Sequence, residues 1–292
     1  MRNGFLFTIF FGLLLPSCQI FDREEDTPSF IAIDEIEVKT NGTGNEGPIT
    51  SNITGAWVFL NDNNMGHWEL PAKVPLYAGG SNNIKIIAGI RINGLEEFRA
   101  QYPFLNFYDE DVDLIRGETI DLAPEVEYFE PINFVWKENF ESSGISIDSV
   151  ANSHTSVTLS SASEDVINGV TSGVVHLHDS ISFFKGISND VFDLPKASAP
   201  VYLELDYKTN MDFIVFLVSH NPTFKTETPV IGLKAKVDDN GNLIQNKVYI
   251  DLAFDVSSNL NASGYQIGVS TNLPAGASSG TFIMDNIKLI HQ

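Results

Sequence analysis

The sequence holds a single cysteine and few basic residues. Its 292 residues include 17 Lys and Arg against 38 Asp and Glu, which gives a formal net charge of −21 at pH 7. One cysteine cannot form a disulfide within the chain or supply a cysteine zinc site. Nucleic-acid binding requires basic side chains that neutralise phosphates. We therefore expect no nucleic acid among the partners of this protein.

Catalytic and cofactor motifs are also scarce. Nothing in the sequence selects two of its many acids as a glycosidase pair. Residues 42–47 match G-x-G-x-x-G, but Pro48 follows and no helix can open there to bind a phosphate. His176 and His178 share one face of a strand without a third metal ligand. The sequence predicts a protein that is not an enzyme and requires no cofactor, although a hydrolase stays open as a third class.

Helical periodicity is almost absent, and its best candidate is residues 95–101. Elsewhere short runs rich in Val, Ile, Phe and Tyr are divided by Gly, Asn, Asp and Pro. Residues 31–38 and 201–207 alternate between apolar and polar side chains, which indicates strands with one buried face. Residues 239–241 read Asp-Asn-Gly between two such runs and predict a hairpin. We expect an all-β protein.

The first residues have the anatomy of a secretory signal. Arg2 precedes an apolar run of about eleven residues, which is too short for a stable membrane anchor. Leu15-Pro16-Ser17-Cys18 resembles the bacterial lipobox. The resemblance implies that residues 1–17 are removed and that Cys18 becomes a lipidated N-terminus, whose two or three acyl chains suffice for stable anchoring. The alternative is an ordinary signal peptide with an incidental cysteine.

The segment after Cys18 indicates where in the cell the protein is located. Gln19 stands where an aspartate would retain a lipoprotein in the inner membrane, and an acidic cluster, Asp22, Glu24, Glu25 and Asp26, follows. The cluster resembles the acidic tether of Bacteroidota lipoproteins exported to the cell surface. The resemblance implies a lipid-anchored outer-membrane protein, displayed at the cell surface on a tether spanning residues 18–30. A solvated linker is the alternative, since charge runs usually are solvated.

The rest of the chain divides into two expected domains. Pro124 and Pro131 bracket an acidic aromatic stretch, so we place a boundary there, between a small β-sandwich at 31–130 and a second β-sandwich at 131–292. Residues 56–90 resemble the surface β-sandwich modules of the PEGA type, except that a longer insertion follows at 94–113.

That insertion holds the densest aromatic cluster of the sequence. We predict that this cluster contacts a partner, because long loops of this kind often do. A small core beneath the loop is the alternative. The cluster consists of Tyr102, Phe104, Phe107 and Tyr108.

The second domain resembles the jelly-roll sandwiches of carbohydrate-binding-module and galactose-binding-like proteins. The likeness is carried by Asn139-Phe140-Glu141 and by the segments 203–208 and 282–287. The resemblance implies a structural calcium held in part by Glu141 and Asp285. Calcium takes six to eight oxygen ligands, so two strand-end acids in water are an equal alternative.

Two functions remain from these patterns. The preferred one is a non-catalytic accessory or scaffold subunit of an outer-membrane protein complex for transport, secretion or barrel assembly. Its partners would be outer-membrane proteins or other lipoproteins, and a lipid anchor would hold it at the membrane. The alternative is a glycan-binding surface lipoprotein of a polysaccharide-capture system.

Overall fold

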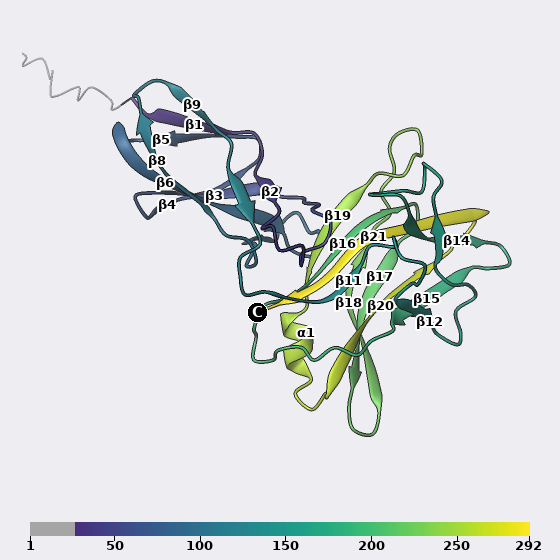
Figure 1. The fold of residues 1–292 in the computed structure, drawn as a ribbon. Coiled ribbons are helices and arrows are strands. Elements are labelled where there is room, and N and C mark those ends of the chain that lie inside the picture. Colours follow the sequence, from purple (N-terminus) through teal and green to yellow (C-terminus); the bar gives the residue numbers. More distant parts are fainter. Residues whose placement is uncertain (1–26) are drawn as a thin grey trace, which may run out of the picture.

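The computed structural model describes residues 27–292, so the signal sequence, Cys18 and the acidic residues at 22–26 lie outside the described residues. It consists of two β-sandwiches, drawn in purple to blue and in green to yellow (Figure 1). Among the described residues no sheet contains strands from both. The all-β prediction is confirmed, because the described residues form 21 strands and one short helix, α1 (Ala253–Ser258). No helix within residues 27–292 is long and apolar enough to cross a membrane.

The N-terminal domain packs a sheet of order β5-β1-β9 against a sheet of order β4-β3-β6-β7, in which β8 also pairs with β6, and a small pair β10-β2 completes it. Alternate side chains of the two larger sheets meet in one core, where Ile31 and Ile33 lie with Ile84 and Ile86. The strands are β1 (Ser29–Ile33), β2 (Glu37–Lys39), β3 (Gly55–Leu60), β4 (Asn63–Glu69), β5 (Ala72–Leu76), β6 (Gly80–Arg91), β7 (Arg99–Gln101), β8 (Tyr108–Leu114), β9 (Thr119–Leu122) and β10 (Glu125–Glu127).

The insertion at 94–113 is part of a sheet and not a long loop. Both β7 and β8 pair with β6, which is twelve residues long and accepts them along different parts of its length. The candidate helix at 95–101 is wrong for the same reason, since its last residues form β7. The backbone N–H and C=O groups of β7 and β8 need hydrogen-bond partners, and the long strand β6 supplies them.

The C-terminal domain is a jelly-roll sandwich. One sheet has the order β13-β14-β21-β16-β19, with β11 also paired to β21, and the other has the order β12-β15-β20-β17-β18. From β14 to β21 the chain passes between the two sheets at every connection except β17 to β18. The strands are β11 (Asn133–Glu138), β12 (Ile147–Ser149), β13 (Thr158–Ser160), β14 (Ser172–His178), β15 (Phe183–Ser188), β16 (Val201–Thr209), β17 (Phe213–His220), β18 (Lys225–Leu233), β19 (Asn246–Asp251), β20 (Gly264–Asn272) and β21 (Ser279–His291).

The hairpin expected at 239–241 is wrong. A turn does form there, with Gly241 N donating to Asp238 O, but it closes only a narrow bridge between Val237 and Leu243. The flanking strands β18 and β19 belong to different sheets, because β18 pairs with β17 and β19 pairs with β16. The connection therefore crosses the edge of the sandwich, at the side where the two domains meet.

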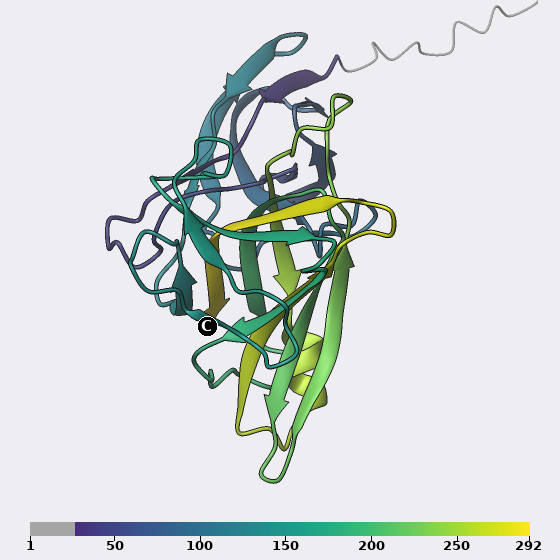
Figure 2. The same ribbon diagram turned by 90° about the vertical axis from the view of Figure 1, so that its right-hand side faces the viewer.

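The two domains meet on the outer face of the sheet that contains β16, β19 and β21 (Figure 2). Tyr202, Tyr249 and Ile290 of that face belong to the core cluster of the N-terminal domain. The alternation of residues 201–207 correctly indicates a strand. Its polar face is not exposed, however, because Glu204 and Asp206 are buried beneath the N-terminal domain. This covered polar face is the most unusual surface of the described chain.

Candidate functional site at the domain junction

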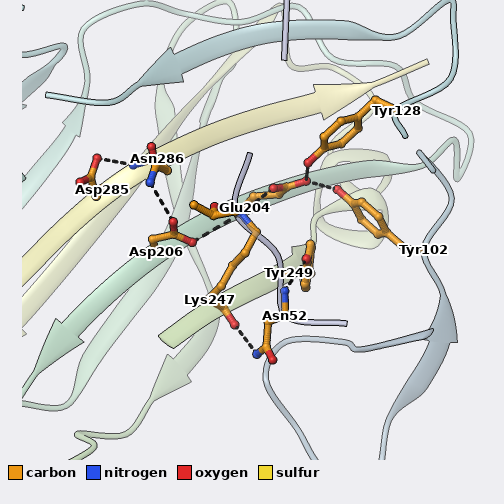
Figure 3. A network of polar contacts seen from close by, with 10 residues as sticks. Asn52, Tyr102, Tyr128, Glu204, Asp206, Lys247, Tyr249, Asp285 and Asn286 are labelled. Atoms are coloured by element: carbon orange, nitrogen blue, oxygen red, sulfur yellow. Dashed lines mark hydrogen bonds and ion pairs between the residues drawn. The ribbon is translucent and has the colours of Figure 1, made fainter. Parts of the chain in front are cut away.

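A cluster of buried charges lies where the domains meet (Figure 3). Lys247 Nζ of β19 is 2.7 Å from Glu204 Oε2 and 3.5 Å from Asp206 Oδ1 of β16, and all three residues are buried. The three side chains share one face because β16 and β19 are paired neighbours. Buried charges require such partners, since an isolated buried ion is very costly.

Two tyrosines of the N-terminal domain complete the shell around Glu204. Tyr102 Oη donates to Glu204 Oε1 at 2.5 Å, and Tyr128 Oη donates to the same oxygen at 2.7 Å (Figure 3). Burial raises the pKa of both tyrosines well above the ordinary value, and the charge of Glu204 acts in the same direction, so both remain donors. The N-terminal domain therefore supplies hydrogen bonds to a carboxylate of the C-terminal domain.

Protonation states in the cluster follow from these contacts. Burial alone raises the pKa of Glu204, but the charges of Lys247 and Lys288 outweigh it and the pKa is lowered. Burial also opposes the charge of Lys247, yet Glu204 and Asp206 raise its pKa above the usual range. The ion pair is thus charged over the whole range of physiological pH.

Short loops of the N-terminal domain reach the same strand, β19. Asn52 N donates to Tyr249 Oη at 3.0 Å, and Asn52 Nδ2 donates to Lys247 O at 2.9 Å. Asp251 N donates to Asn93 Oδ1 at 3.0 Å. Gly94 has a φ of +69°, which residues other than glycine rarely adopt, so glycine allows this turn to form next to Leu233 and Val248 of the C-terminal domain.

Two residues of the expected contact cluster are core residues of this junction. Tyr102 and Phe104 are buried, and both rings pack against Tyr202 with centroids 5.6 and 5.8 Å away. The prediction that these two face a partner is wrong, because the C-terminal domain already covers them. Phe107 is 49% exposed and Tyr108 is partly exposed, so their contact with a partner stays a prediction.

The two acids assigned to calcium lie on either side of one loop. Glu141 Oε1 accepts from the backbone N–H groups of Val170 and Thr171, and Asp285 Oδ2 accepts from Asn168 N and from Ser172 Oγ. These carboxylates therefore hold N–H and O–H donors. Within residues 27–292 no group of three or more His, Cys, Asp or Glu side chains could hold a metal ion. The structural calcium stays a prediction.

Three adjoining hollows follow the junction, and we call them together the junction groove. The end hollow, of about 520 Å³, lies at the ends of β17, β18 and β20. The junction hollow, of about 160 Å³, lies between the turn at 91–95 and β19, and the side hollow, of about 300 Å³, lies beside residues 50–52. The end and junction hollows share Gly232, Leu233 and Lys234, and the junction and side hollows share Asn52, Asn246 and Lys247.

Free polar groups and apolar side chains both line this groove. Asn272 in the end hollow and Gln245 in the side hollow make no side-chain hydrogen bond to any residue of the range 27–292. Ile214, whose side chain is 43% exposed, supplies apolar surface in the end hollow. No tryptophan of the described chain lines any of the three hollows. No sequence pattern singles out Asn272 or Gln245, because they come from distant strand ends and resemble ordinary turn residues.

A buried amine next to the cluster predicts a pH effect. Burial lowers the pKa of Lys288 to about 8, and the nearby charge of Lys247 lowers it further. The carboxylates of Glu204, Asp206 and Glu46 raise the pKa but do not outweigh burial. The folded chain therefore releases this proton near pH 8, whereas the unfolded chain keeps it until about pH 10.5. Stability thus rises with pH across this window. The matched variant is Lys288→Met, which lacks this amine but keeps all other titratable groups. Between pH 7.5 and 9.5, the unfolding free energy of the parent should rise by on the order of 2 kcal/mol more than that of the variant. Urea denaturation at a series of pH values measures both proteins. If their unfolding free energies change with pH in parallel, the prediction is wrong.

Comparisons with known proteins return only distant structures. No family model and no curated protein matches the chain. A structure from a study of promiscuous specificity in carbohydrate-binding modules of the β-sandwich superfamily is 12% identical, with 80% of this chain and 84% of that chain covered and a TM-score of 0.37.

Two further structures each cover about half of this chain. The family 11 carbohydrate-binding module of a cellulosomal cellulase of Clostridium thermocellum is 12% identical, covering 55% of this chain and 97% of that one, with a TM-score of 0.33. The K2 cleaved adhesin domain of Lys-gingipain is also 12% identical, covering 55% and 98%, with a TM-score of 0.35. Because identities and TM-scores are this low, we base the function on the groove itself.

Proposed function

We propose that this chain is a non-catalytic, lipid-anchored outer-membrane protein whose junction groove binds a carbohydrate chain. The observation that carries the proposal is the pair of unbonded amides, Asn272 and Gln245, at the two ends of a groove with an apolar wall. Ligand sites combine apolar lining with a few convergent polar groups in this way. Lipidation at Cys18 and the acidic tether lie outside the described residues and enter as predictions from the sequence.

The chemistry of the lining suits sugars. A sugar ring has a rim of hydroxyl groups, which both donate and accept, and an apolar C–H face. A side-chain amide offers a donor and an acceptor side by side, so Asn272 and Gln245 can each engage a hydroxyl in both senses. The exposed side chain of Ile214 can pack against the C–H face. The succession of three hollows suits a chain of several sugar residues better than a single small molecule.

The accessory-subunit hypothesis is less well supported by the structure. One of its grounds is the aromatic cluster of the insertion at 94–113, and two members of that cluster, Tyr102 and Phe104, are buried in the domain junction. Phe107 alone of that cluster keeps half of its surface in solvent. A single half-exposed ring is a weak anchor, since interface energy concentrates in clustered, well-packed residues. Binding of a protein partner through this surface stays a prediction.

The test of glycan binding uses the full chain in detergent and a panel of soluble polysaccharides in native gels. At least one polysaccharide should retard the protein, and Asn272→Ala and Gln245→Ala should each weaken the retardation by about five- to tenfold in apparent Kd. Gln101→Ala is the matched control, because this exposed amide on β7 lies outside the groove. If no polysaccharide retards the protein, or if the control weakens binding as much as the groove variants, the proposed function is wrong.

A further inference from the structure

The junction hollow concentrates positive charge on a strongly acidic protein. Four basic side chains line it and no Asp or Glu of the described residues does, although the whole chain has 17 basic residues against 38 acidic ones. One lies at the end of β6 in the N-terminal domain, one lies on β19, and two lie in the segment that follows β18. The four are Arg91, Lys234, Lys236 and Lys247.

Two of these charges are neutralised within the protein. Lys247 is paired with Glu204 inside the junction. Lys234 Nζ is 2.6 Å from Asp212 Oδ2 on the wall of the end hollow. Neither charge is therefore fully available to a ligand.

Of the other two, Lys236 has no acid partner within residues 27–292, and Arg91 has only ion pairs at long distance. Lys236 is exposed, and its Nζ donates to the neutral Asn246 Oδ1 at 2.9 Å. Arg91 is 3.6 Å from Glu96 and 3.9 Å from Glu69, which are long ion-pair distances, and the carboxylate of Glu69 is engaged by Arg99. Arg91 Nε is buried and has no hydrogen-bond partner among the described residues. A guanidinium and an ammonium thus line one hollow with donors to spare.

We infer that the junction hollow binds a negatively charged sugar residue, so that the ligand is an anionic polysaccharide. The inference rests on the proposed function and names the class of glycan. A carboxylate or sulfate group would accept hydrogen bonds from Arg91 and Lys236, and charge-assisted bonds are stronger than neutral ones. The neighbouring neutral parts of the chain would lie in the end hollow. The aromatic residues that line the end and junction hollows, Phe213, Tyr207 and Tyr249, are buried, so charge takes the place of ring stacking as the main attraction.

The acidic surface does not prevent this. At physiological salt the Debye length is about 8 Å, so acids elsewhere on the surface are largely screened from a group in contact with Arg91. The same screening weakens a contact pair when salt is raised further. Affinity for an anionic chain should therefore fall with ionic strength, while affinity for a neutral chain should not.

The experiment compares each of three anionic polysaccharides, polygalacturonate, alginate and unsulfated chondroitin, with its own carboxyl-reduced form, which carries no charge. The full chain in detergent should bind at least one of them about tenfold more tightly than the reduced form at low salt. Lys236→Gln and Arg91→Gln should each remove most of that preference, because they weaken binding of the native form several times more than binding of the reduced form. Lys225→Gln is the control, because Lys225 is exposed at the start of β18 and outside the groove.

The outcomes separate the two proposals. Equal affinity for native and reduced forms, with no effect of Lys236→Gln or Arg91→Gln, overturns the charge inference and leaves glycan binding standing. Loss of preference in Lys225→Gln as large as in the groove variants shows unspecific attraction and also overturns it. If the protein binds no polysaccharide of any charge, the proposed function fails as well. A preference lost only in the groove variants supports the inference.

Discussion

Replacing Lys247 by methionine is expected to lower the free energy of unfolding by about 3–5 kcal/mol, because the change leaves Glu204 and Asp206 as buried carboxylates without their cation. Urea denaturation followed by tryptophan fluorescence measures the effect. Lys225→Met serves as the control, since Lys225 is exposed and takes part in no ion pair between described residues.

A second variant separates the value of the pair from the cost of breaking it. Glu204→Gln combined with Lys247→Met removes a charge of each sign, so it should be more stable than Lys247→Met alone. Tyr102 and Tyr128 can still donate to the side-chain amide oxygen that Glu204→Gln introduces. If Lys247→Met proves as stable as the parent, the charges are solvated and the junction is not built around them.

Phe104→Ala should cost about 3–5 kcal/mol, because truncating a fully buried Phe removes its transfer energy and leaves a cavity. Phe107→Ala should stay within about 0.5 kcal/mol of the parent, since that ring is half in solvent. The Lys85 ammonium 5.3 Å above the Phe107 ring adds little at such an exposed site.

The same pair of variants also tests the accessory-subunit hypothesis. A Phe104→Ala protein that keeps its stability but loses a co-purifying membrane partner would restore this residue to a contact surface. A Phe107→Ala protein that loses such a partner at unchanged stability would support a contact through the remaining exposed ring. Unfolding curves and affinity purification of both variants distinguish these results.

Strand content was predictable, but the surroundings of each strand face were not. The alternation at 201–207 indicates β16 correctly, because side chains of a strand point to opposite faces in turn. It does not show that the face with Glu204 and Asp206 is covered by a second domain. The burial of Tyr102 and Phe104, which lie on the N-terminal side of the same junction, was missed for the same reason. Aromatic residues in an apparent loop look exposed until the neighbouring sheet is known.

The candidate site was beyond the reach of sequence patterns for a related reason. Asn272, Gln245 and Lys236 belong to different parts of the jelly roll and line three hollows of one groove. The groove passes the connection at which the chain crosses from the sheet of β18 to the sheet of β19. The sequence favoured a hairpin at 239–241, which would have placed those strands side by side. Local turn chemistry was interpreted correctly, whereas the long-range pairing that competes with it was not visible.

The position of β21 sets the order of events when the C-terminal domain forms. This strand pairs with β11, β14 and β16, yet it is the last strand of the domain in sequence, and its partner β11 is the first. The chain between β11 and β21 must close into a loop before these two strands can pair with each other, and contacts of such high sequence separation form slowly. Until residues 279–291 are available, β11, β14 and β16 keep unpaired edges that can recruit other chains. The domain therefore completes its fold only once its whole sequence is present, and a chain interrupted before β21 is an aggregation hazard.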